Sequence, residues 1–136
     1  MRIMAIDHGS ARCGCAISDP TGTIARPLGV IEPEPRAVAE LVTEHEAELV
    51  VVGLPVSLGG TEGAQATEAR AFEDALAAIL DVPVETYDER LTTRLGERSA
   101  RAGAKASPDA LAAAHLLESF LRARAESGEE TGEPLE

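Results

Sequence analysis

Acidic residues stand at three places in the sequence that a fold could bring together. Asp7 ends the first apolar segment, the pair Asp88 and Glu89 ends a later one, and Asp109 opens a long helical pattern. In an open α/β sheet the carboxyl ends of the strands form one edge, where such proteins place their sites. Carboxylates that meet there repel one another unless a cation neutralises them, and hard divalent cations prefer oxygen ligands. The pattern therefore predicts a divalent-cation site.

The spacing of apolar residues predicts that Asp109 faces the sheet. Position 109 shares one helix face with Ala113, Leu116 and Phe120. A carboxylate on that face needs a partner, because burial of an unpaired charge is costly. The helix dipole alone also favours an acid in the first turn, so this position has a purely structural explanation as well.

Simpler explanations exist for the other acids too. Asp88 and Glu89 could form a solvated turn with Arg90 as their ion partner, and Asp7 could merely end its strand. Alternation along a strand sends Asp88 and Glu89 to opposite faces, so the sequence leaves open which of them would bind a cation.

The remaining polar features carry weaker signals. Cys13 and Cys15 share one face of a strand, and two thiols are too few for a structural zinc site, so we expect them in the core. His8 fits a turn or a position near a metal or phosphate, while His45 and His115 fit surface or helix-packing positions. The Gly-rich residues 53–63 precede a helix and could hold a phosphate, although they lack the Gly-Lys-Ser/Thr of a Walker sequence.

Hydrophobic periodicity predicts five strands and four helices. The strands are expected at residues 3–7, 13–18, 23–31, 49–52 and 82–87, and the helices at 34–46, 62–80 with Thr61 as N-cap, 91–102 and 108–124. The first three strands, joined by short turns, predict an antiparallel meander, and the helix-linked strands after them predict parallel pairing. We therefore expect an α/β fold with a mixed five-stranded sheet flanked by helices.

The composition indicates one globular domain. The chain has 136 residues, of which 44% are hydrophobic, enough for a core. No apolar run approaches the roughly 20 residues that span a membrane, and the N-terminus lacks the pattern of a signal peptide. We expect a cytoplasmic protein with no membrane contact, one domain at residues 1–125 and an acidic, disordered tail at 126–136.

The charge argues against a strongly basic binding surface. The net charge is −12, and five of the acids lie in the tail. Lys105 is the only lysine, and the arginines that make up the other bases suit bidentate contact with phosphate. Aromatic residues amount to 2%, which argues against a base-stacking platform of several rings.

Four segments, in the right order, resemble the motifs of the YqgF/RuvX family of Holliday-junction-resolvase-like nucleases. Residues 7–19 resemble its opening motif, residues 52–55 with 60–66 its Gly-rich loop, residues 88–93 its most specific motif, and residues 109–121 its final helix. The resemblance covers residues 2–124, nearly everything but the tail.

The resemblance implies a ribonuclease H-like fold and a phosphodiesterase that uses two Mg²⁺ or Mn²⁺ ions. By motif matching, the catalytic and metal-binding acids are Asp7, Asp88, Glu89 and Asp109. The candidate contacts with the substrate backbone are Arg12, Gly59, Gly60 and Arg90. The implied substrate is the 5′ end of pre-16S rRNA during ribosome biogenesis, or branched DNA such as a Holliday junction. Endo- and exonuclease action, and a monomer and a homodimer, all stay open at this point.

Two departures from the family pattern keep other functions in view. The stretch before the last helix is short and holds one base, Lys105, and His8 replaces a Pro or an aromatic residue. A non-catalytic nucleic-acid-binding or scaffold protein that retains the fold is the main alternative. A nucleotide-binding ATPase of the actin and sugar-kinase kind needs two such domains, and 136 residues supply one.

Overall fold

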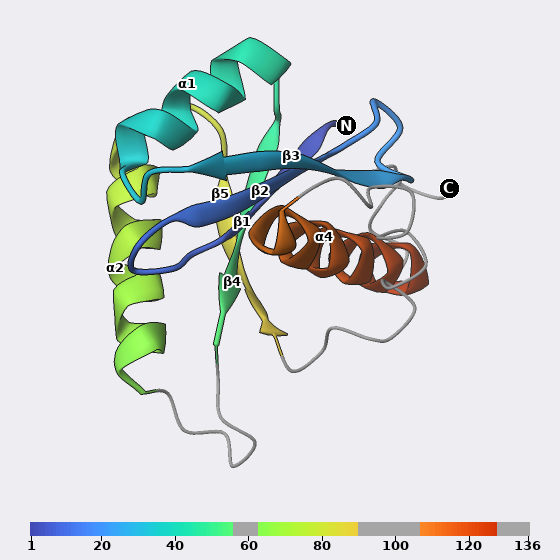
Figure 1. The fold of residues 1–136 in the computed structure, drawn as a ribbon. Coiled ribbons are helices and arrows are strands. Elements are labelled where there is room, and N and C mark those ends of the chain that lie inside the picture. Colours follow the sequence, from blue (N-terminus) through green and yellow to red (C-terminus); the bar gives the residue numbers. More distant parts are fainter. Residues whose placement is uncertain (56–62, 90–106, 128–136) are drawn as a thin grey trace.

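In the computed structural model, a five-stranded sheet is covered on both faces by helices (Figure 1). The structure describes residues 1–55, 63–89 and 107–127. The strands are β1 (Ile3–Asp7), β2 (Cys13–Ser18), β3 (Ala25–Ile31), β4 (Leu49–Leu54) and β5 (Val84–Asp88). The helices within the described residues are α1 (Pro35–His45), α2 (Ala64–Ile79) and α4 (Pro108–Ser127).

The strand order in the sheet is β3-β2-β1-β4-β5. The first three strands form an antiparallel meander, and β4 and β5 pair in parallel with β1 and with each other. The predicted α/β class with a mixed five-stranded sheet is therefore confirmed. This order brings the carboxyl ends of β1, β4 and β5 to one edge, so Asp7 and the Asp88–Glu89 pair end neighbouring parts of the sheet.

The core has two layers, because β1, β2 and β4 are buried on both faces. On one face, α1 and α2 cover side chains that include Met4, Ile6 and both cysteines. On the other face, α4 lies across β1, β2 and β3 and covers Ile3 and Ala5 (Figure 1). Cys13 and Cys15 are buried free thiols, as predicted.

Some predicted bounds shift in the structure. Helix α2 begins at Ala64 with Gly63 as its N-cap, so the prediction of Thr61 as N-cap is wrong. Helix α4 runs to Ser127, beyond the predicted end near residue 124. In β3 the register shifts opposite Cys15 and Ala16, where Pro27 cannot donate a ladder hydrogen bond.

Two further predictions concern segments that lie wholly or mostly outside the described residues. The predicted helix at 91–102 lies outside them, as does most of the proposed tail. None of the helices that the structure describes is long and apolar enough to cross a membrane.

Candidate active site

Asp7 stands at the carboxyl end of β1 and faces α4. Ile3 and Ala5, which precede it by four and two residues, lie in the core layer under α4, so alternation places Asp7 on the same side. Its backbone is fixed by pairing with Gly14 of β2. The predicted face of Asp7 is therefore the observed one, and a strand in the middle of the sheet holds the carboxylate.

Glu89, and not Asp88, lies on the same side as Asp7. Along β5, Val84 packs against the layer under α1 and α2, whereas Tyr87 packs against the layer under α4. Alternation then puts Asp88 with Val84 and Glu89 with Tyr87. Of the two acids, Glu89 is therefore the one whose side chain lies on the Asp7 side of the sheet.

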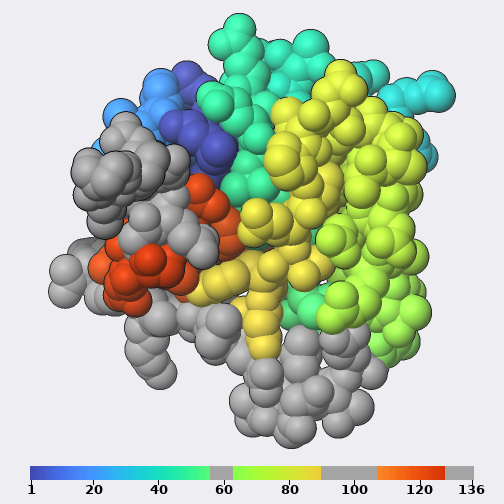
Figure 2. All heavy atoms as spheres, turned by 180° about the vertical axis from the view of Figure 1, so that it is seen from behind, coloured from blue at the N-terminus to red at the C-terminus, as the bar shows by residue number. Residues whose placement is uncertain are grey.

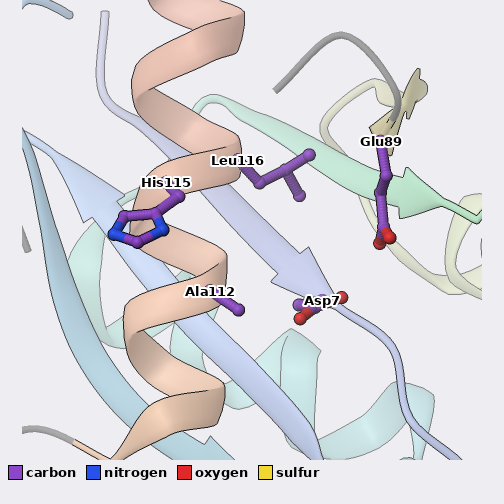
Figure 3. A pocket seen from close by; sticks show the side chains of 5 residues that line it. All are labelled: Asp7, Glu89, Ala112, His115 and Leu116. Atoms are coloured by element: carbon purple, nitrogen blue, oxygen red, sulfur yellow. The ribbon is translucent and has the colours of Figure 1, made fainter. Parts of the chain in front are cut away.

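The carboxyl groups of Asp7 and Glu89 share a hydrogen bond, and in Figure 3 the Glu89 side chain points toward Asp7. Burial raises the pKa of Glu89 to about 7, and the negative charge of Asp7 adds to the rise. Burial also raises the pKa of Asp7, although the hydrogen bond from Glu89 opposes that rise. Both carboxyl groups therefore bind a proton more readily than isolated ones do.

Gly53, near the end of β4, makes room for Glu89. A Cβ at Gly53 would lie 2.7 Å from Oε2 of Glu89 and 3.0 Å from Cδ2 of Leu116. The carboxylate of Glu89 thus crosses β4 at the one point where the strand carries no side chain. The same glycine lets Leu116 of α4 approach the strand closely.

Asp109 is placed by a backbone contact between α4 and β2. A Cβ at Gly14 would lie 1.9 Å from the carbonyl oxygen of Asp109, so only glycine allows α4 to begin there. Because Gly14 pairs with Asp7, the first turn of α4 lies beside Asp7, and the charge of Asp109 contributes to the raised pKa of Asp7. The side chain of Asp109, however, is bound to Arg12, with 2.5 Å between Nε and Oδ2.

Two clefts flank the Asp7–Glu89 pair. The first, of about 180 Å³, is lined by both acids and by Ala112, His115 and Leu116 of α4 (Figure 3). The second, of about 130 Å³, lies on the α2 side and is also lined by both acids. Figure 2 shows β5 at the surface between α2 and α4, and Asp88 and Glu89 at its end are half-buried.

Two histidines line these clefts: His8, which the sequence places in a turn or near a metal or phosphate, and His115, which it places at a surface or helix-packing position. His8 lines the second cleft, and its ring centroid lies 4.7 Å from that of Phe72. Burial lowers the pKa of His8. His115 lines the first cleft, where its ring points away from the two carboxylates in Figure 3. Its buried Nε2 has no hydrogen-bond partner among the described residues. Nothing in the pattern of the helix distinguishes His115 from a packing residue, so sequence reasoning missed it.

The donor set fits one divalent cation. Asp7 and Glu89 offer hard oxygen ligands from facing carboxylates, and a cation between them would relieve the repulsion that raises the pKa of Glu89. Within residues 1–55, 63–89 and 107–127, no three acidic, His or Cys side chains lie close enough to form a metal cluster. Asp109 would have to leave Arg12 to become a third ligand.

The other predicted site residues divide into two groups. Arg12 is exposed and forms an ion pair with Asp109 at the start of α4. Three predicted substrate contacts lie outside the described residues: Gly59, Gly60 and Arg90. The structure thus brings Asp7 and Glu89 together, keeps Asp109 nearby, and turns Asp88 to the opposite face.

Comparison with known proteins gives concordant results. The profile of a family described as RuvX, Holliday junction resolvase, matches residues 1–123. A protein of Chloroflexus aggregans named "Putative pre-16S rRNA nuclease" is 43% identical, covering 90% of this chain and 94% of the relative. A protein of the same name from Listeria monocytogenes is 40% identical, covering 89% and 97%.

Among solved structures, Thermus thermophilus RuvC in complex with a Holliday junction substrate matches with a TM-score of 0.64 at 19% identity. The match covers 93% of this chain and 97% of RuvC. At this identity the likeness establishes the fold, which is that of a ribonuclease H-like resolvase.

Proposed function

Because the chain belongs to the RuvX family of Holliday junction resolvases and is a nuclease, we propose that Asp7 and Glu89 hold the divalent cation with which it hydrolyses phosphodiester bonds. The observation that carries the proposal is the hydrogen bond between these two carboxyl groups at the carboxyl edge of the sheet. Two half-buried acids side by side are unfavourable for folding, and a catalytic cation would account for their presence.

Asp7 and Glu89 would hold Mg²⁺ or Mn²⁺, which when bound would neutralise charge on the phosphate and lower the pKa of a water molecule. Asp7, fixed by the ladders of β1, holds its carboxylate in a constant position. Glu89, crossing Gly53, closes the site from the β5 side. In the reaction a water oxygen bonds to phosphorus, the bond from phosphorus to one ester oxygen breaks, and that oxygen leaves with a proton.

Asp109 and Arg12 complete the proposed site. Asp109 is the further ligand that a second ion would require, and it becomes available when Arg12 turns to a substrate phosphate. Arg12 suits that role, because its side chain is 64% exposed and a guanidinium binds phosphate oxygens in a bidentate way. Asp88 is the weaker candidate, since it lies on the face away from Asp7.

We propose RNA as the substrate, with the 5′ end of pre-16S rRNA as its natural source. Relatives at about 40% identity are named "Putative pre-16S rRNA nuclease", and this chain matches them over nearly their whole length. The likeness to RuvC concerns the fold and does not favour a DNA junction for this chain. The acidic composition requires that a cation and the arginines, and not a general basic surface, hold the phosphates.

Cleavage assays test both parts of the proposal. An RNA that spans the 5′ end of the 16S sequence and a four-way DNA junction are each incubated with the protein and Mg²⁺ or Mn²⁺. We expect cleavage of the RNA by the wild type and loss of cleavage in Asp7→Asn and Glu89→Gln, while Asp88→Asn keeps most activity. Equal cleavage by wild type and Asp7→Asn would show that these acids do not perform the reaction.

A further inference from the structure

The second cleft contains chemistry that holding a cation does not use. It lies between the loop after β1 and the first turns of α2, and it opens onto the Asp7–Glu89 pair. The other lining residues are His8, Gly9, Ser10, Pro55, Gln65 and Glu68. Whatever occupies this cleft therefore lies next to the phosphate that Asp7 and Glu89 would act on.

One wall of the cleft offers a flat ring on a firm support. The imidazole of His8 packs against Phe72 with ring centroids 4.7 Å apart and an interplanar angle of 42°. Phe72 is buried in the layer under α2, so it cannot move away from His8. Proteins that bind single-stranded RNA stack unpaired bases on such rings, histidine included. A supported ring of this kind can stack with one base. The few aromatic residues of the chain argue against a platform for several bases.

The polar groups of the cleft are suited to reading the edge of a base. Gln65 and Glu68 stand three residues apart on α2, and so on the same helix face, with both side chains exposed. A carboxylate accepts two hydrogen bonds, and an amide both donates and accepts. Glu68 also lies near enough to His8 for its charge to act on the imidazole.

The charge of the cleft excludes a phosphate as its occupant. Three carboxylates line it, from Asp7, Glu68 and Glu89, and a cation at the Asp7–Glu89 pair leaves Glu68 uncompensated. A neutral group with several hydrogen-bond donors is the chemistry that such a lining attracts.

We propose that this cleft is a subsite for the nucleobase next to the scissile phosphate, and that it prefers guanine. The inference rests on the proposed nuclease function. Guanine presents two adjacent donors, N1–H and the N2 amino group, to a carboxylate that accepts both. Uracil presents one donor between two carbonyl oxygens, which Glu68 repels. Adenine and cytosine, each with one amino group beside an acceptor, fall between them.

Base preference is measured with short single-stranded RNAs. After the cleavage site is mapped, each base is placed in turn on either side of it, and kcat/KM is compared. We expect guanine to be preferred over uracil by about tenfold at one of the two positions. Inosine, which lacks the N2 amino group, should fall between them. A preference of less than twofold at both positions would overturn the proposal.

Variants connect the preference to the cleft. In Glu68→Gln the ratio of guanine to uracil should fall to about twofold or less, because a neutral amide no longer accepts both donors. Asp74→Asn is the matched control, since Asp74 is exposed on the same helix and does not line the cleft. A ratio that survives in Glu68→Gln, or that falls equally in Asp74→Asn, would contradict the assignment.

A binding measurement separates failure of the subsite from failure of the nuclease proposal. The dissociation constants of the same RNAs are measured with the wild-type protein in EDTA, where no divalent cation is present. Preference for guanine in binding, without cleavage after Mg²⁺ or Mn²⁺ is added, would support the subsite and refute the nuclease proposal. Cleavage without base preference in either measurement would support the nuclease proposal and refute the subsite.

Discussion

Gly14 and Asp109 are in direct backbone contact, and this contact fixes the start of α4 beside the edge of the sheet that carries Asp7. A Cβ on Gly14 would lie 1.9 Å from the Asp109 carbonyl oxygen and 2.4 Å from its carbonyl carbon. Gly14 is also the strand partner of Asp7. A residue without a side chain therefore sets the separation between two of the acids, which come from opposite ends of the chain.

The first prediction concerns Gly14→Ala. The methyl group meets backbone atoms, which cannot rotate away, so α4 must shift outward. We expect a loss of about 1–3 kcal/mol in the free energy of unfolding, measured by urea denaturation. Gly63→Ala is the control, because a Cβ there meets nothing within 4 Å. A Gly14→Ala protein as stable as Gly63→Ala would mean that α4 is not docked on β2 in this way.

The second prediction concerns Gly53→Ala, whose methyl group would meet Glu89 Oε2 at 2.7 Å. The end of a flexible side chain can move aside, so stability should fall less than in Gly14→Ala. The displaced Glu89 should lower kcat about a hundredfold, since a shift of about 1 Å in a catalytic group costs that much. Comparing kcat with Tm checks this, and an unchanged kcat would argue against a role for Glu89 at its observed position.

The sequence predicts the parts of this site that depend on periodicity. Alternation along β1 places Asp7 correctly, and the apolar face of α4 places its first turn against the sheet. Contacts between elements could not be predicted in that way. The pairing of Arg12 with Asp109 depends on how far α4 reaches across β2, which Gly14 decides only once the two elements are packed.

The same limit explains the missed residues. His8 and Glu68 line one cleft because α2 packs on β5 and on β4, the neighbour of β1, and no spacing within a single segment encodes that packing. His115 lines the first cleft, and its neighbours in sequence on α4, Ala114 and Leu116, are buried apolar residues, so its pattern is that of a packing residue. To decide which of Asp88 and Glu89 faces Asp7, one must know on which face of the sheet Tyr87 lies, relative to the face that α4 covers.

The third prediction is a pH dependence of stability. Glu89 has a pKa of about 7 in the folded protein and 4.5 as its ordinary value, so the folded state binds more protons between these values. Its contribution to stability is then fully present below pH 4.5 and is lost as pH rises toward 7. In EDTA, we expect the Tm of the wild type relative to Glu89→Gln to fall between pH 5 and pH 8. A difference in Tm that stays constant over this range would contradict the raised pKa of Glu89.

The fourth prediction concerns the cation. Because Mg²⁺ or Mn²⁺ binds the folded state, it should raise Tm by roughly 5–10 °C at about one hundred times its Kd. Asp7→Asn should remove this rise, since one of the two facing ligands is lost. Asp81→Asn, at an exposed position beyond α2, is the control and should respond as the wild type does. If Asp7→Asn is stabilised equally, the cation binds elsewhere.

The last prediction concerns the pairing of Arg12 with Asp109 and separates the two roles proposed for these residues. In Arg12→Ala, Asp109 loses the guanidinium and is free to turn toward Asp7, so Mn²⁺ should bind more tightly, by roughly twofold to fivefold. The same variant loses a phosphate contact, so its Kd for RNA should rise. Arg12→Lys should restore part of the RNA affinity through its charge, but not bidentate binding. Titration calorimetry measures the two effects in separate experiments, one with Mn²⁺ and no chelator, the other with RNA in EDTA. Arg26→Ala on β3 is the control in both. Weaker binding of Mn²⁺ in Arg12→Ala would mean that Arg12 holds Asp109 in its ligating position and does not compete with the cation for it.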